Sequence, residues 1–132
     1  MVSLAYHIEN EELVSMKRPN IIDNENENYS EISYPFISKF YGTTKENNYR
    51  IIEFVSEKTL YDINKIHLDM NEKITVIFEL MLTIEYLHQK KFVYRDLKPS
   101  NVMIDENKDI VLIDFDRMIK KDDDIIYNQH TI

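Results

Sequence analysis

The sequence predicts an α+β fold with short strands first, one long helix in the middle and small hairpins at the end. Three observations support this class. Short strand-like apolar segments occur within the first 55 residues, helical periodicity begins at residue 69, and short apolar runs beside polar turns follow residue 91. The length of 132 residues suits a single domain, and no internal repeat divides it.

Two pairs of strands are predicted in the first part of the chain. Residues 2–8 and 13–16 form the first pair, joined by a short polar turn. Residues 36–41 and 49–55 form the second pair, joined by a turn that contains the only glycine of the chain. Residues 23–28, between the pairs, are polar and acidic without apolar periodicity, so they are either a loop or a frayed helix.

A long helix is predicted for residues 69–89. Asp69 is the predicted N-cap, and Glu72 three residues later completes the pattern of a capping box. Apolar residues recur at three- and four-residue steps and share one face, which we expect to pack into the core. These residues are Ile74, Ile77, Phe78, Met81, Ile84 and Leu87.

A hairpin is predicted after this helix. Residues 102–104 and 110–113 are apolar and flank the polar turn at residues 105–109. The tail carries three successive aspartates at residues 122–124, has no clear element and is interpreted as a solvated charge run.

Composition excludes several classes of protein. Sixteen basic residues against 24 acidic ones give a net charge of −8, which disfavours non-specific binding of nucleic acid or an anionic membrane. No apolar run approaches the ~20 residues of a membrane span, and the N-terminus lacks the pattern of a signal peptide. Without cysteine the chain has neither a disulfide framework nor a thiolate zinc site. We therefore expect a cytoplasmic or nuclear protein.

The residues that carry chemistry gather in one short stretch. Asp96 and Asn101 lie on a predicted loop with Lys98 between them, and Asp114 follows a hydrophobic strand. Aspartate and asparagine oxygens suit Mg²⁺, and a neighbouring lysine suits a phosphoryl group in transfer. Asp96 could instead orient a hydroxyl nucleophile and accept its proton. Phosphoryl transfer is one candidate reaction from this spacing.

Residues 94–101 resemble the catalytic loop of eukaryotic protein kinases, and residues 114–116 resemble their magnesium-binding motif. The step of 18 residues from Asp96 to Asp114 is the one that such an alignment requires. The Asp-Leu-Lys-Pro-x-Asn form is more similar to serine/threonine kinases than to tyrosine kinases. The resemblance implies a partial two-lobed kinase fold, with an incomplete β-rich N-lobe and hinge in residues 1–55. The first part of a helical C-lobe would follow in residues 56–132.

The resemblance also implies a role for individual residues. Asp96 would be the catalytic base and Lys98 would meet the γ-phosphate of ATP, whereas Asn101 and Asp114 would hold Mg²⁺. The remaining contacts to ATP would come from Lys17 at the α- and β-phosphates and from three residues at the adenine, namely Glu53, Val55 and Met103.

Two further assignments follow from the same resemblance. A glutamate should pair with Lys17, and both Glu25 and Glu31 are candidates, with Glu25 preferred. Tyr94 and Phe115 would stack with Phe40 in an internal spine between the lobes.

The sequence departs from the family pattern in several places. Tyr94 replaces the usual histidine, and Asp116 replaces the usual glycine, which tolerates a positive φ more readily than aspartate does. Placed on the pattern, the sequence starts at the second strand and stops early in the activation segment, without the glycine-rich loop. We therefore expect the isolated chain to be poorly stable, because later helices would normally cover the apolar stripe of the long helix. We also expect it to be nearly inactive and to bind ATP weakly, because only Lys17 and the metal site would hold the phosphates.

These features predict a fragment of a protein serine/threonine kinase, which transfers the γ-phosphoryl group of ATP to protein Ser or Thr hydroxyls. Its cofactors would be ATP and Mg²⁺, and its partner a protein substrate. The alternative is a non-catalytic module similar to a pseudokinase, or a truncated remnant. The departure at Asp116 supports that alternative.

Overall fold

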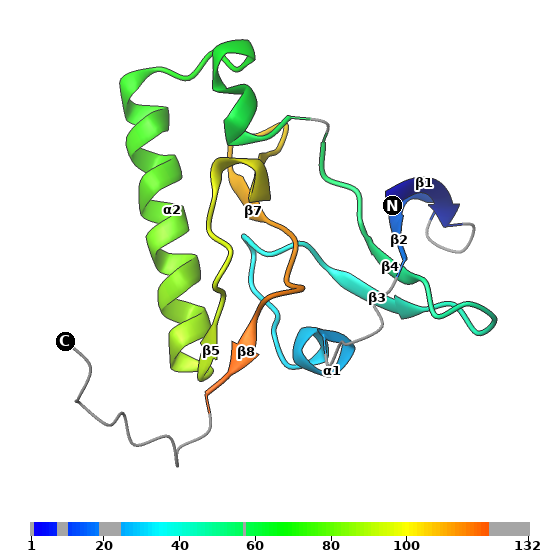
Figure 1. Cartoon of the computed structure of the whole chain (residues 1–132). Helices are drawn as coiled ribbons and strands as arrows, with labels where there is room; N and C mark the ends of the chain where they lie inside the picture. The colour runs from blue at the N-terminus through cyan, green and yellow to red at the C-terminus, as the bar shows by residue number, and fades with distance from the viewer. Residues whose placement is uncertain (1, 8–10, 19–24, 57, 122–132) are drawn as a thin grey trace.

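The computed structural model describes residues 2–7, 11–18, 25–56 and 58–121. Two groups of elements are visible in Figure 1: a four-stranded sheet with the short helix α1 beside it, and the long helix α2 with small strands along it. The α+β class and the partial two-lobed arrangement that the sequence predicts are confirmed. None of the described helices combines the length and the apolarity that a membrane span needs.

Four antiparallel strands form the main sheet in the order β1-β2-β4-β3. Their bounds are Val2–His7 for β1, Glu12–Lys17 for β2, Phe40–Thr43 for β3 and Arg50–Glu53 for β4. The first predicted pair of strands is confirmed as β1 and β2, which pair along their whole length. Residue 8, the predicted end of the first strand, lies outside the described residues.

Residues 36–41 do not form the single strand that the sequence predicts. The strand β3 begins only at Phe40, whereas Ile37 makes an isolated parallel bridge to Leu112. The N–H of Ser38 donates to the carbonyl of Leu112 at 3.1 Å. The segment before β3 therefore uses its backbone to join the sheet to a strand near the C-terminus. A strand-like apolar pattern cannot distinguish these two kinds of pairing.

The turn between β3 and β4 is also shorter than predicted. Gly42 lies inside β3, where the pairing with β4 shifts register, and its φ of 130° is one that glycine adopts without strain. The fourth strand ends at Glu53, so residues 54–55 are not part of the strand that the sequence predicts there.

The acidic stretch before β3 contains a helix. Of the two readings left open for residues 23–28, the helix is found as α1 (Glu25–Ser30), and residues 23–24 lie outside the described part of the chain.

The long helix α2 spans Met70–Gln89 and follows a 3₁₀ segment, Leu60–Lys65. Its predicted capping box is confirmed, because Asp69 Oδ1 accepts from the Glu72 N–H at 2.9 Å and Glu72 Oε2 accepts from the Asp69 N–H at 2.7 Å. Reciprocal bonds of this kind satisfy backbone donors that the first turn leaves unpaired.

The prediction that the apolar stripe of α2 forms core is wrong for most of the stripe. Ile74, Ile77, Phe78 and Met81 are each 58–65% exposed, and of the stripe only Leu87 is fully buried. The buried face instead carries Val76, Glu79, Thr83 and Leu87. A helix buries the face on which other elements rest, and here those elements are β5 and β7.

Two small antiparallel pairs complete the fold. The predicted hairpin is confirmed as β6 (Val102–Ile104) and β7 (Ile110–Leu112), one residue shorter than expected at its end. The other pair consists of β5 (Phe92–Val93) and β8 (Ile119–Lys120). A single 3₁₀ turn, Pro99–Asn101, leads into β6.

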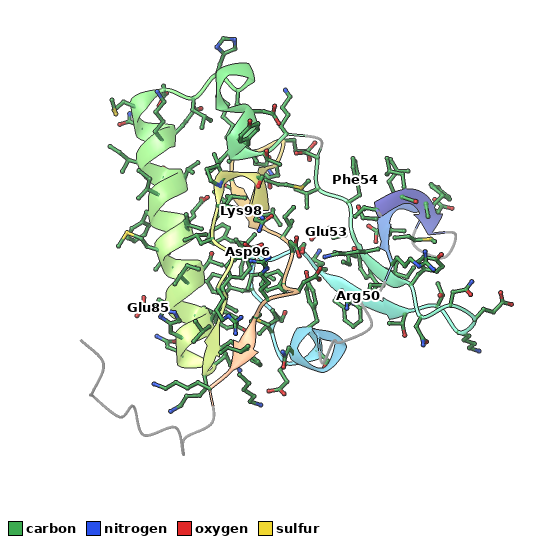
Figure 2. All side chains as sticks on the ribbon, viewed as in Figure 1. Arg50, Glu53, Phe54, Glu85, Asp96 and Lys98 are labelled. Carbon is green, nitrogen blue, oxygen red and sulfur yellow. The ribbon has the colours of Figure 1, made fainter. Side chains whose placement is uncertain are left out.

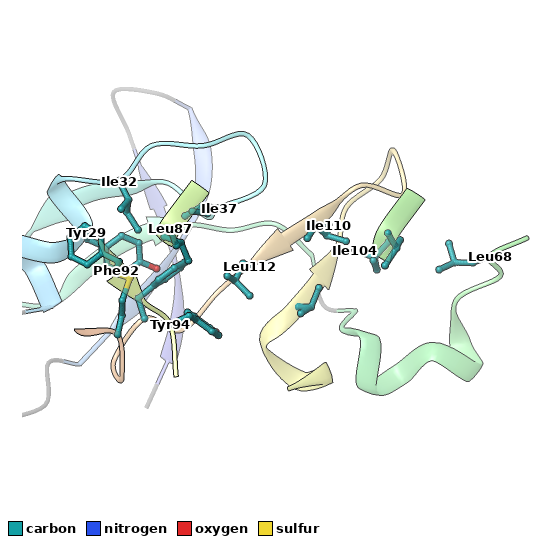
Figure 3. Close-up of a cluster of buried hydrophobic side chains, with 14 residues drawn as sticks. Tyr29, Ile32, Ile37, Leu68, Leu87, Phe92, Tyr94, Ile104, Ile110 and Leu112 are labelled. Carbon is teal, nitrogen blue, oxygen red and sulfur yellow. The ribbon is translucent and has the colours of Figure 1, made fainter. Parts of the chain in front are cut away.

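A continuous hydrophobic core connects these parts (Figure 3). It draws buried side chains from α1, the segment before β3, α2 and the small strands, including Tyr29, Ile37, Leu87, Phe92 and Leu112. Phe40 of β3 packs against this core, which therefore links the four-stranded sheet to the small strands on either side of the loop that carries Asp96.

Candidate active site

A cleft of about 380 Å³ lies between the four-stranded sheet and the β6/β7 hairpin. Its lining is mostly apolar, with charged groups at a few places. The lining residues that the sequence analysis singled out are Lys17, Glu53, Val55, Met103 and Asp114, which come from four separate parts of the chain. The structure therefore brings these predicted site residues together.

Lys17 ends β2 and reaches two carboxylates. Its Nζ lies 2.9 Å from Asp114 Oδ1 and 2.7 Å from Asp116 Oδ1. The Lys17 side chain is only 17% exposed, so water screens these pairs less than pairs on an open surface. The predicted phosphate-binding lysine and the predicted metal-binding aspartate are thus direct neighbours.

Asp96, labelled in Figure 2, is surrounded by donors on the loop between β5 and the 3₁₀ turn. Its Oδ2 lies 3.2 Å from Lys98 Nζ and 3.0 Å from Asn101 Nδ2, and its Oδ1 lies 3.9 Å from Arg117 Nη1. Partial burial acts to raise the pKa of Asp96, but the hydrogen bonds from Lys98 and Asn101 and the charge of Arg117 outweigh it and lower the pKa. The carboxylate is therefore ionised and available as a base near neutral pH.

Asn101 holds this loop in shape. The side chain is 5% exposed, and Nδ2 donates both to Asp96 Oδ2 and to the backbone carbonyl of Asp96, at 3.0 and 2.9 Å. The Asn101 carbonyl accepts from the N–H of Ile113 at 3.0 Å, which ties the loop to the residue before Asp114.

Comparison with known proteins gives the family. The family model described as the protein kinase domain matches residues 3–126. The chain belongs to the protein kinase family. The resemblance of residues 94–101 and 114–116 to the kinase motifs is thereby confirmed at the level of the family.

Named relatives agree with this assignment. Developmentally-regulated protein kinase 1 of Dictyostelium discoideum is 37% identical over 110 residues, covering 80% of this chain and 15% of the relative. The putative serine/threonine-protein kinase PRKY of Homo sapiens is 32% identical over 108 residues, covering 79% of this chain and 39% of the relative. The cAMP-dependent protein kinase catalytic subunit PRKX of Mus musculus is 34% identical, with coverage of 79% and 30%. The chain thus spans 15–39% of the length of these kinases.

The backbone of the kinase magnesium motif differs from the expectation. The left-handed conformation falls on Asp114, with φ of 61°, and not on Asp116. Aspartate adopts this region at lower cost than most residues. The hydroxyl of Tyr94 donates to the carbonyl of Ile113, just before the turn, and so helps to hold it. Asp116 does not have a positive φ, so the backbone strain expected from replacing glycine by aspartate does not arise at this position.

The donor chemistry at Asp114 and Asn101 fits Mg²⁺. Mg²⁺ is usually bound through one or two protein oxygens, with phosphate oxygens and water in the other positions. In the described part of the chain no group of three His, Cys, Asp or Glu side chains is arranged to hold a metal ion.

The predicted adenine contacts line the cleft of this kinase domain. Glu53 uses its N–H for the carbonyl of Lys39 at 2.9 Å, and its Oε2 accepts from the Lys39 N–H at 3.0 Å. Val55 lies beyond β4 and Met103 on β6, on two sides of the same cleft.

The internal aromatic spine contains one residue that the sequence analysis missed. Tyr29 lies between Phe40 and Phe115, with ring centroids 5.3 and 4.7 Å away, and Phe115 meets Tyr94 at 5.3 Å. Burial raises the pKa of Tyr29 well above its usual range, and its hydroxyl lies 3.2 Å from Ser38 Oγ. Tyr29 lies four residues after Glu25, so the two side chains share one face if the segment is a helix. The sequence leaves open whether this segment is a loop or a helix, so it does not predict the role of Tyr29.

Of the two glutamates predicted as candidate partners of Lys17, one pairs elsewhere and the other has a side chain outside the described residues. Glu31 follows α1 and pairs instead with Lys120 at 2.5 Å, so the structure does not bring it to Lys17. Glu25 begins α1, and its side chain lies outside the described residues. The described partners of Lys17 are Asp114 and Asp116.

Proposed function

We propose that this kinase domain binds Mg-ATP in the cleft beside Lys17 and Asp114 and transfers the γ-phosphoryl group to a Ser or Thr hydroxyl of a protein. One observation carries the proposal above all others. Asp96, Lys98 and Asn101 converge on one loop, with Asp96 kept ionised by its neighbours. This combination of an ionised carboxylate and a positive group beside the developing charge suits a general base in phosphoryl transfer.

In this proposal each residue has a distinct part. The substrate hydroxyl donates its proton to an Asp96 oxygen as its own oxygen bonds to the γ-phosphorus, and the bond from that phosphorus to the β-phosphate bridging oxygen breaks to leave ADP. Lys98 offsets negative charge on the transferred group, and Lys17 binds the α- and β-phosphates. Mg²⁺ bound by Asn101 and Asp114 would neutralise charge on the phosphates. Glu53, Val55 and Met103 hold the adenine, and Glu25 remains the proposed glutamate partner of Lys17.

A second candidate is the non-catalytic module. It is favoured by the two carboxylates that already neutralise Lys17, because phosphates must compete with Asp114 and Asp116 for the same ammonium. Such a domain would serve through its surface and would bind nucleotide weakly or not at all.

The two candidates separate in one experiment on the full 132-residue chain. Mg-ATP affinity is measured by calorimetry, and phosphoryl transfer to a basic protein substrate is followed with γ-labelled ATP. We expect Asp96→Asn to lower transfer by about 100-fold or more, with Mg-ATP affinity unchanged within about twofold. Glu106→Gln, which neutralises an exposed acid in the β6/β7 turn, is the matched control and should behave as wild type.

Equal transfer by wild type and Asp96→Asn would contradict the proposed role of Asp96. Mg-ATP binding without any transfer would favour the non-catalytic candidate. Asp114→Ala adds a second check, because it should remove the magnesium dependence of ATP binding.

A further inference from the structure

Two cations face each other in the four-stranded sheet. Lys17 of β2 and Arg50 of β4 are directly paired in the antiparallel register. Arg50 is completely buried, although arginine is rarely so. Like charges opposite one another destabilise a sheet, and a buried guanidinium requires a charged or hydrogen-bonding partner. An anion beside this pair is therefore needed for the fold.

One oxygen of Asp116 meets both cations. Asp116 Oδ1 lies 2.7 Å from Lys17 Nζ and 3.0 Å from Arg50 Nη1. Figure 2 shows Arg50 within the four-stranded sheet, whereas Asp116 lies 66 residues later in the chain, at the last position of the motif at residues 114–116. The contact therefore joins the sheet to the loop that holds Asp114.

Asp116 stands at the position where the family pattern has glycine, which has no side chain to supply this contact. The second carboxylate at Lys17 is Asp114, which is also the proposed metal ligand. A carboxylate that binds a metal is less available to hold a lysine. Of the two described partners of Lys17, Asp116 is therefore the one that stays available to hold the ammonium throughout a nucleotide cycle.

We propose that Asp116, anchored by the buried Arg50, is a positioning residue that holds the Lys17 ammonium at the phosphate end of the cleft. The identity of the ligand in this inference rests on the proposed function. The contact between Asp116 and Lys17 is independent of that function. In this proposal the aspartate in place of glycine supplies a contact that the site uses, and it does not indicate loss of nucleotide binding.

The first test uses stability and needs no nucleotide. Urea unfolding of the full chain is compared for Lys17→Met, Asp116→Asn and the double variant, and again in an Arg50→Met background. We expect the midpoint shifts of the single variants not to add, because each removes the same pair. In the Arg50→Met background this coupling should fall, because Asp116 loses its anchor. Additive midpoint shifts would overturn the proposal whether or not the chain binds ATP.

The second test measures Mg-ATP affinity by calorimetry under conditions where each variant is folded. Asp116→Asn should weaken binding about tenfold, the effect of losing one hydrogen bond to a charged group. Arg50→Met should weaken it similarly, and the double variant Asp116→Asn/Arg50→Met no further. Asp116→Glu keeps the charge and should retain affinity within about threefold, and Glu106→Gln is the control for loss of a negative charge.

A purely structural role would lower the melting temperature of Asp116→Asn and leave the affinity of the folded protein unchanged, and that result would overturn the proposal. Wild-type protein that shows the Lys17–Asp116 coupling but binds no Mg-ATP would support the positioning contact and contradict the proposed function. The two failures are thus distinguishable.

Discussion

Asp96 shows how a single residue is prepared for chemistry by its neighbours. Both carboxylate oxygens face positive or hydrogen-bonding groups from Lys98, Asn101 and Arg117. The lowered pKa of Asp96 means that its interactions stabilise the folded state above the ordinary aspartate pKa, and that this stabilisation is lost as the pH falls through the lowered value. The same shift keeps the proposed base unprotonated across the physiological range.

Removal of Lys98 should raise the pKa of Asp96. In Lys98→Met the hydrogen bond and the charge that lower this pKa are lost, whereas partial burial still acts to raise it. A titration of the Asp96 side-chain carboxyl by ¹³C NMR should therefore show a midpoint at higher pH in the variant. Arg117→Gln, which removes a more distant and exposed charge, should give a smaller shift in the same direction. An unchanged midpoint in Lys98→Met would show that Lys98 does not contact Asp96 in solution.

Tyr94 combines ring packing with one hydrogen bond, and the two can be separated. Tyr94→Phe keeps the contact with Phe115 but loses the bond to the Ile113 carbonyl, so it should lower the free energy of unfolding by about 1 kcal/mol. Tyr94→Ala also loses the buried ring and should cost about 3–5 kcal/mol. Urea unfolding measures both. Equal losses in the two variants would assign the whole effect to the hydroxyl.

The part of the site that could be predicted is the part that is local in sequence. Asp96, Lys98 and Asn101 lie within six residues, so a motif brings them together without knowledge of the rest of the fold. The Asp116–Arg50 pair depends on tertiary structure, and nothing in the pattern of the fourth strand marks a buried arginine. Its role was therefore missed, although Asp116 itself was recognised as unusual.

At the scale of elements, α2 exposes apolar side chains on one face and buries two polar side chains on the other. Its start was predictable, because a capping box needs only two residues at a fixed spacing. Its buried face was not predictable, because it carries Glu79 and Thr83 and is recognised only by what packs on it. Glu79 Oε2 accepts from the Ile110 N–H at 3.0 Å, and Thr83 donates to the Glu79 carbonyl at 2.7 Å. These polar contacts join α2 to the β6/β7 hairpin.

Glu79→Gln should stabilise the protein at neutral pH. Burial raises the pKa of Glu79, and the nearby carboxylates of Asp109 and Asp105 raise it further, against the effect of the Ile110 N–H. A raised pKa means that the folded state binds the proton more tightly, so stability falls as the pH rises from the ordinary glutamate pKa toward the raised value. The amide oxygen of glutamine still accepts from Ile110 without that cost, and the gain should be on the order of 1 kcal/mol.

Thermal melts of wild type and Glu79→Gln between pH 4 and pH 8 measure this effect. The difference in melting temperature should be largest at pH 8 and should shrink toward pH 4. Thr75→Val, on an exposed part of the same helix, is the control for a change of hydrogen bonding in α2. A constant difference across the pH range would show that the ionisation of Glu79 does not destabilise the fold.

At the scale of the whole molecule, the exposed face of α2 governs behaviour in solution. Ile74, Ile77, Phe78 and Met81 are exposed. From Met81 toward the end of α2, a groove of about 670 Å³ lies between the helix and the half-exposed Leu97. Contiguous apolar surface of this kind favours association between protein molecules. The interior contacts of the domain do not depend on these side chains, so association and folding stability can be changed separately.

Replacing two residues of this face should abolish association while leaving the fold intact. In Ile77→Glu/Met81→Lys the new charges lie four residues apart in the order that favours a helical ion pair, and the net charge does not change. We expect the weight-average mass of wild type in analytical ultracentrifugation to rise with concentration and that of the variant to stay at the monomer value. Its free energy of unfolding should stay within about 0.5 kcal/mol of wild type, as for other exposed positions.

The control Asn47→Glu/Asn107→Lys places the same charges on two exposed turns and should associate as wild type does. A monomeric wild type, or a control that also loses association, would show that the face of α2 is not what holds the molecules together.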